Sequence, residues 1–164
     1  MNEMKLKRKD PYGQLSVDET KVARLREHIL GKIAYDDERL GELDEEEQAI
    51  YILCLFQSHA ASTGVYNFFD APLVLLRAKV EAALERVGAF RMLDGLRATG
   101  KVVLGSADPS FEEYDALTTE EQEQRREAAM HFCNLESGVD DDLDPKIDGL
   151  LLRHFAERGY EIED

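Results

Sequence analysis

The segment D44-E-E-E-Q-A-I-Y-I-L-C-L-F56 decides the fold class, because an acidic run leads there into eight residues that are apolar on every side. Such a run suits the central helix of a bundle, although its β-branched and aromatic residues also suit a buried strand. The polar flanks DEEEQ and QSHAAS extend the pattern to about twenty residues, which favours a helix. Asp44 is the expected N-cap, and Glu45 to Glu47 fall in the first turn, where negative charge suits the helix dipole.

Glycine and proline divide the chain after this helix. Gly64 is expected to end the central helix. Pro72 suits the first turn of an amphipathic helix that runs to Val87. A further short helix begins at Ala89 and is expected to end at Gly100.

Three aromatic residues stand in the connection T63-G-V-Y-N-F-F-D-A-P72, where a polar loop would be usual. They are Tyr66, Phe68 and Phe69. We expect this segment to be buried, with each ring packed against the core where two helices diverge. Burying one Phe side chain contributes roughly 1.5–3 kcal/mol, enough to hold such a connection in place. We therefore predict a structural role.

Capping-box patterns predict the starts of two outer helices. Ser16-Val17-Asp18-Glu19 precedes a helix that reaches Ile33, and Thr118-Thr119-Glu120-Glu121 precedes one that reaches about Glu136. A last helix follows the acidic turn at 137–145. No strand pattern competes, so the sequence predicts an all-α fold, a single compact domain of about six to eight helices. This domain spans residues 14–164 and follows a flexible basic tail at residues 1–13.

Charge is unevenly distributed along the chain. The 164 residues carry 35 acidic and 20 basic side chains, a net charge of −15. Residues 1–33 have a net charge of +3 and residues 34–164 a net charge of −18. The acidic part repels DNA and anionic lipid, so direct nucleic-acid or membrane binding is not expected, and basic proteins are the expected partners. Solubility alone is the competing explanation.

Catalytic and metal-binding motifs are not found in the sequence. The four histidines have no metal-ligand spacing, and no nucleophile elbow, P-loop or dinucleotide-binding motif occurs. The acidic run from Asp140 resembles a calcium loop, but Pro145 and Leu151 stand where Gly and Glu are required. We predict no catalytic residue, cofactor or metal. Cys54 and His59 stand five positions apart on one helix and so point in different directions, but a Cys–His pair assembled between helices stays open as an alternative.

Cysteine content and hydropathy indicate the compartment. Cys54 and Cys133 both lie in apolar helical surroundings, where a free thiol packs as a small hydrophobic group. A reduced, cytoplasmic protein is expected. The basic N-terminus has no apolar run behind it, and no apolar stretch reaches the length of a membrane span.

The carboxylates themselves are the predicted partner-binding groups. Acids three or four positions apart on a helix lie about 5–6 Å from one another, so a row of them can imitate the charges of a phosphate backbone. A solvated helix end with no further role is the simpler explanation for any one acid. On local charge density, the predicted binding residues are Asp36, Asp37, Glu38, Glu42, Glu45, Glu46, Asp140, Asp141, Asp142 and Asp144.

One protein family resembles the middle of the chain. The resemblance rests on E45-E-E-Q before the apolar helix, G64-V-Y-N-F-F after it, and A83-L-E-R-V-G-A89, and it covers about residues 43–100. It is to small acidic bacterial proteins that include a DNA mimic and are mostly catalogued as a domain of unknown function. The turn departs from the family pattern, which has two glycines and Phe where this chain has Thr63-Gly64-Val65-Tyr66.

The resemblance implies an all-helical domain that occupies the DNA-binding surface of a transcription regulator and acts as a dimer. The leading hypothesis is therefore an acidic protein that mimics DNA and sequesters a basic DNA-binding partner, with a homodimer as a further expectation. Two alternatives stay open. One is a small helical enzyme without a recognised motif, and the other is an acidic immunity-type binder of a basic toxin.

Overall fold

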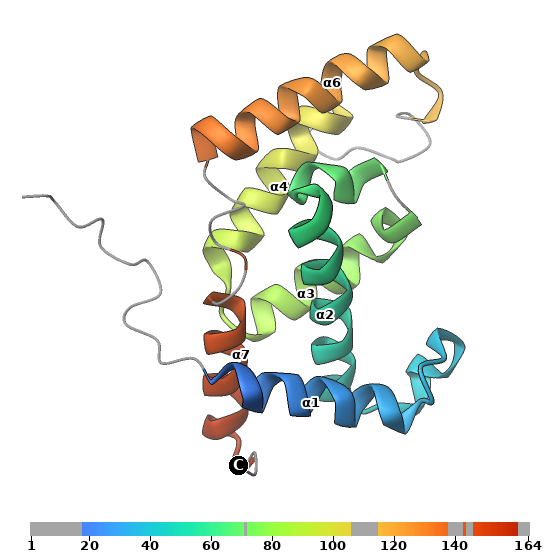
Figure 1. Cartoon of the computed structure of the whole chain (residues 1–164). Coiled ribbons are helices and arrows are strands. Elements are labelled where there is room, and N and C mark those ends of the chain that lie inside the picture. The colour runs from blue at the N-terminus through green and yellow to red at the C-terminus, as the bar shows by residue number, and fades with distance from the viewer. Residues whose placement is uncertain (1–17, 71, 106–114, 138–142, 144–145, 161–164) are drawn as a thin grey trace, which may run out of the picture.

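A computed structural model describes residues 18–70, 72–105, 115–137, 143 and 146–160. Within these ranges the elements are helical and no strand occurs, so the predicted all-α fold with a single compact domain is confirmed. In Figure 1, α2 runs through the middle of the molecule and α1 crosses its lower end. α6 lies across the opposite end, and α7 stands beside α1. The predicted basic tail at residues 1–13 lies outside the described residues.

The central helix is α2 (Glu45–Thr63), as the sequence predicts. Asp44 caps it through a capping box, in which its side chain accepts from the Glu47 amide while the Glu47 side chain accepts from the Asp44 amide. Gly64 ends the helix with φ at 88°, a value that favours glycine. Most of the middle of α2 is buried, because helices pack against it from several sides.

The first described helix begins two residues later than its capping-box pattern suggests. α1 (Glu19–Lys32) has Asp18 as its N-cap, and the Asp18 carboxylate accepts from the amides of Thr20 and Lys21. Asp18 adopts the extended conformation that an N-cap requires, which corrects the assignment of this role to Ser16. A short 3₁₀ helix, η1 (Asp37–Glu42), then leads to α2.

The aromatic connection forms two 3₁₀ helices, η2 (Val65–Asp70) and η3 (Pro72–Leu76), which lead into α3 (Arg77–Arg86). Phe68 and Phe69 are fully buried and meet edge to face, with ring centroids 5.3 Å apart. Phe68 also contacts the Phe56 ring of α2 at 5.5 Å. Two of the three rings therefore hold the connection in the core. Tyr66 departs from the prediction, because it is only half-buried.

α4 (Phe90–Leu104) is longer than predicted, because Gly100 lies inside the helix rather than at its end. A Cβ atom at position 100 would lie 2.9 Å from Cε1 of Phe69, so the absence of a side chain lets the ring pack against the helix. Gly105, with φ at 77°, is the residue that ends α4 in the left-handed conformation.

The last described helices complete the domain. α6 (Thr119–His131) begins with the predicted capping box between Thr118 and Glu121. A π-helical turn, η4 (Phe132–Ser137), follows it, and α7 (Lys146–Glu157) closes the chain of described elements. α6 packs on α4, η4 and η2. A search of the described helices finds none with the length and apolarity of a membrane span.

Candidate functional site

The predicted binding acids of η1 stand near the start of α2. Asp36 caps η1 by accepting from the Glu38 amide, and Asp37 accepts from the Tyr51 hydroxyl. Glu42 forms a bidentate pair with Arg39, with distances of 2.9 and 2.7 Å, and the hydrogen bond from Arg39 holds the pKa of Glu42 below its ordinary value.

Glu38 differs from the other acids of η1. Its side chain is exposed, and no ion pair with another described residue involves it. It is therefore the η1 acid whose charge is least compensated among the described groups.

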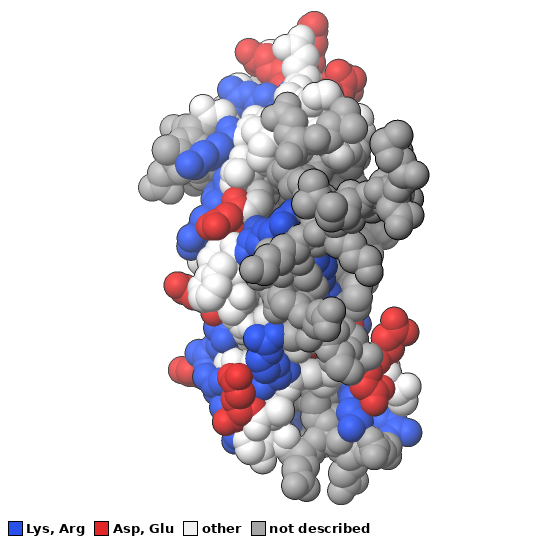
Figure 2. Space-filling model, turned by 90° about the vertical axis from the view of Figure 1, so that its left-hand side faces the viewer, with Lys and Arg blue, Asp and Glu red and all other residues white. Residues whose placement is uncertain are grey.

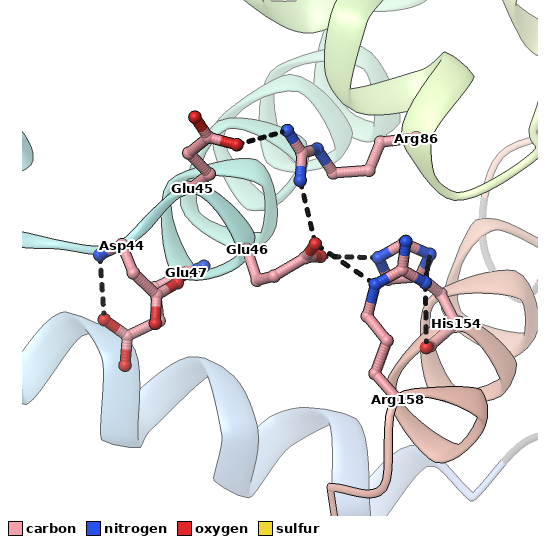
Figure 3. A network of polar contacts seen from close by, with 7 residues as sticks. All are labelled: Asp44, Glu45, Glu46, Glu47, Arg86, His154 and Arg158. Carbon is pink, nitrogen blue, oxygen red and sulfur yellow. Dashed lines mark hydrogen bonds and ion pairs between the residues drawn. The ribbon is translucent and has the colours of Figure 1, made fainter.

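The three glutamates that open α2 bond to side chains of other helices, and two of them share one arginine (Figure 3). Glu45 accepts from Nη2 of Arg86 on α3 at 2.9 Å, and Glu46 accepts from Nη1 of the same guanidinium at 2.8 Å. Glu47 pairs with Lys32 at the end of α1. The acidic run therefore links the start of α2 to α1 and α3.

Glu46 is also the meeting point with α7. Nε2 of His154 lies 2.5 Å from Oε2 of Glu46, and Nε of Arg158 lies 3.2 Å from Oε1 (Figure 3). Because Nη1 of Arg158 donates to Nδ1 of His154 at 2.9 Å, the imidazole carries its proton on Nε2 and donates it to Glu46. The side chains of His154 and Glu46 are only 6% and 16% exposed. This is a nearly enclosed junction of α2, α3 and α7.

Burial is the largest single influence and raises the pKa of Glu46, but the hydrogen bonds from His154 and Arg86 and the electrostatic attraction to them together leave the pKa below its ordinary value. The hydrogen bonds from Arg86 to Glu45 and Glu46 also favour the charged form of the guanidinium, so they raise the pKa of Arg86. The Glu46 carboxylate is therefore held in its charged form by the fold. Its charge stabilises helix packing and is largely compensated before any partner arrives.

The structure thus divides the predicted binding residues into groups. Glu42, Glu45 and Glu46 are in ion pairs with arginine, and Asp36 and Asp37 accept hydrogen bonds within the domain. Glu38 is exposed, and no ion pair between it and a described residue is found. The other four predicted residues, Asp140, Asp141, Asp142 and Asp144, lie outside the described residues.

A second set of acids, on α6, was not singled out from the sequence. Glu120, Glu123 and Glu127 are exposed, and no ion pair between them and the described residues is found. Their spacing of three and four residues places them in one row along the helix. That spacing is visible in the sequence T119-E-E-Q-E-Q-R-R-E127. Residues 36–47 hold a denser run of acids, and a prediction based on local charge density favours that run over the α6 row.

The face drawn in Figure 2 shows the same contrast. Acidic side chains gather at the top, where α6 lies, whereas Lys and Arg alternate with Asp and Glu over the described surface below. The segment that joins α4 to α6, residues 106–114, adds Asp108, Glu112 and Glu113 to the sequence and has no basic residue. Three exposed glutamates for which no ion pair with a described residue is found, Glu120, Glu123 and Glu127, therefore lie together at the α6 end.

The Cys–His alternative has little geometric support. Cys54 faces a groove between α1 and α2, together with Arg26 and Tyr51, whereas His59 contacts the backbone oxygen of Asn67 at 3.3 Å. Cys133 is buried and contacts the Thr99 hydroxyl at 3.3 Å. Among the described residues, no group of three His, Cys, Asp or Glu side chains is placed to hold a metal ion.

Comparison of the chain with family models, curated proteins and solved structures found no match. The resemblance to the acidic DNA-mimic family therefore stays an expectation that rests on the quoted sequence segments.

Proposed function

We propose that this chain is an acidic interaction protein that mimics DNA and occupies the nucleic-acid-binding surface of a basic partner, such as a transcription regulator. The observation that supports this proposal best is the row of exposed glutamates on α6, Glu120, Glu123 and Glu127, for which no ion pair with another described residue is found. A row of this spacing offers Arg and Lys side chains a series of carboxylates about 5–6 Å apart.

The ion pairs at the start of α2 also bear on this proposal. A carboxylate that already accepts from arginine would have to lose that interaction before it could bind a partner's arginine. Glu45 and Glu46 are in this situation, and Glu46 is in addition largely buried. The α6 row carries no such cost, so we place the partner-binding surface there rather than at residues 42–47.

The test begins with capture of partners from a lysate of the source cells on the immobilised chain. Duplex DNA is then added as a competitor at several salt concentrations. Displacement of the captured protein by DNA, and a steep weakening of capture as salt rises, are expected for a protein that imitates the phosphate backbone. Capture that neither DNA nor salt affects would contradict the proposal.

The triple variant Glu120→Gln, Glu123→Gln, Glu127→Gln tests whether the partner binds at the α6 row. The amount of partner that it captures should fall to a small part of the wild-type amount. A matched control removes the same number of charges elsewhere, through Glu19→Gln, Glu38→Gln and Glu85→Gln, three exposed acids on other elements. Equal loss in the two variants would show that net charge alone drives binding, and circular dichroism checks that both are folded.

A further inference from the structure

A groove lies between η2 and α6, directly beside the acidic row. Its described lining consists of Tyr66 from η2 and Glu123, Arg126, Glu127 and Met130 from α6, and its volume is about 220 Å³. Tyr66 is half-buried, and Met130 is 41% exposed. An aromatic ring and a methionine thus form an apolar surface that is open to solvent beside the exposed glutamates of α6.

Both walls of this groove are fixed to the core. On the η2 side, the neighbours of Tyr66 include Phe68 and Phe69, which are fully buried. On the α6 side, Nη1 of Arg125 donates to the Leu104 backbone oxygen at 2.8 Å and ties α6 to the end of α4. A site whose walls are already in place loses less conformational entropy when it binds a ligand.

The charge at the groove is mixed but mainly negative. Glu123 and Glu127 are exposed at its edge, and Glu120 continues the row one turn earlier. Arg126 is the basic residue among the described lining, and it is half-buried. A cationic segment is therefore favoured at the edge, and an apolar side chain is favoured between Tyr66 and Met130. Methionine suits such a contact because its flexible, polarizable side chain adapts to different shapes.

We propose that this groove binds a basic segment of a partner protein, and that it takes up one aliphatic or aromatic side chain of that segment while flanking Lys and Arg residues contact the α6 glutamates. The proposal rests on the proposed function and narrows it. A surface that only imitates phosphates would accept any basic segment. This surface selects segments in which an apolar residue stands between the basic ones.

The test uses two fluorescent peptides with the same Lys and Arg residues, one with a central Leu and one with Ser in its place. Binding to the full chain is measured by fluorescence polarisation at low and moderate salt. Burial of a Leu side chain predicts an affinity about tenfold higher for the Leu peptide. That ratio should persist as salt weakens both peptides, because salt screens charges and not apolar contacts.

Variants locate the effect. Met130→Gln should reduce the affinity for the Leu peptide to that for the Ser peptide and leave the Ser peptide unchanged. Leu75→Gln is the matched control, since Leu75 is 75% exposed on η3, and it should change neither affinity. A ratio that Met130→Gln leaves intact would overturn the proposed groove.

The same measurements separate this inference from the proposed function. If both peptides bind equally and both are lost when Glu123 and Glu127 become Gln, the acidic surface stands and the apolar groove is overturned. If a third peptide, with the Leu but with neutral residues in place of Lys and Arg, binds as well as the basic one, the acidic surface has no role. In that case both the proposed function and this inference fail.

Discussion

At the scale of one residue, the ring of Phe69 decides which side chains position 100 can hold, although the two residues are far apart in the sequence. A Cβ there would lie 2.9 Å from Cε1 and 3.1 Å from Cζ of Phe69, a ring with no room to move because it is fully buried. Gly100→Ala should therefore destabilise the domain by about 1–2 kcal/mol, since overpacking outweighs the gain in helix propensity.

Gly31 is the matched control for this change. It lies in the last turn of α1, and no atom would come within 4 Å of an added Cβ. Gly31→Ala should stabilise the domain by about 0.5–1 kcal/mol. Urea denaturation of the two variants measures both values, and shifts of the same sign would contradict the predicted contact with Phe69.

Glu46 is the residue on which the junction of α2, α3 and α7 depends. Glu46→Gln weakens its contacts with Arg86, Arg158 and His154 in a nearly enclosed position, so we expect a loss of about 1–3 kcal/mol at neutral pH. Glu45→Gln is the control, because Glu45 shares Arg86 but is 83% exposed. Its cost should stay below about 0.5 kcal/mol.

The pH dependence of that loss follows from the direction of the Glu46 pKa shift. The pKa is lower in the folded chain than its ordinary value of 4.5, so the unfolded chain takes up a proton first as the pH falls. The stabilisation by Glu46 is therefore fully present at pH values above 4.5, and it is lost as the pH falls below 4.5 and through the lower pKa of the folded chain. Urea denaturation at a series of pH values should show wild type and Glu46→Gln converging in acid; a constant difference would refute the assignment.

At the scale of one element, α6 buries few of its own side chains. Ala129 is its one buried residue among those described, and Arg125 ties it to the Leu104 oxygen at the end of α4. This bond also satisfies a carbonyl of the α4 C-terminus, where a positive charge is favourable. Arg125→Met should therefore cost about 1 kcal/mol, and the loss should be confined to α6 and the end of α4.

Amide hydrogen exchange measures this local effect. Faster exchange in α6 with unchanged exchange in α1 and α2 is the expected result. Gln124→Met, a change to the same residue at the neighbouring exposed position, is the control. Equal acceleration in all helices would mean that Arg125 acts on global stability instead.

Local signals in the sequence predict where helices begin, but they do not predict which residues of different helices contact one another. Asp44 and Thr118 were identifiable as helix starts because a cap depends on residues within one turn. The expectation that Gly100 ends a helix is wrong, because the reason for a glycine there is the ring of Phe69, about thirty positions earlier. The pairing of Glu46 with Arg86 and Arg158 was equally hidden, since both bases lie far along the chain.

At the scale of the whole molecule, the two ends of the domain use acidic residues differently. At the start of α2 the carboxylates accept from side chains of α1, α3 and α7 and hold helices together. At the α6 end the exposed glutamates form no ion pair with the described residues. Part of the net charge of −15 therefore serves to hold helices together, whereas the row of glutamates on α6 stays exposed to a partner.

A buried polar cluster joins the first and last described helices across the domain. Nη2 of Arg26 on α1 donates to Oδ1 of Asp148 on α7 at 2.6 Å and to Oε1 of Gln57 on α2 at 2.9 Å. Nε2 of Gln57 donates to the same Asp148 oxygen at 3.0 Å. Asp148 and Gln57 are 6% and 2% exposed, so water does not compensate readily for a lost partner.

Removing one side of this cluster should cost more than removing both. Asp148→Leu leaves the Arg26 guanidinium without its carboxylate, and we expect a loss of about 3 kcal/mol. In the double variant Arg26→Met, Asp148→Leu no unpaired charge remains, so part of the loss should be regained, with a coupling energy of about 1–3 kcal/mol. The exposed pair Arg39–Glu42 serves as the control cycle, with a coupling below about 1 kcal/mol. Additive losses at Arg26 and Asp148 in urea denaturation would mean that this ion pair does not contribute to holding α1 and α7 together.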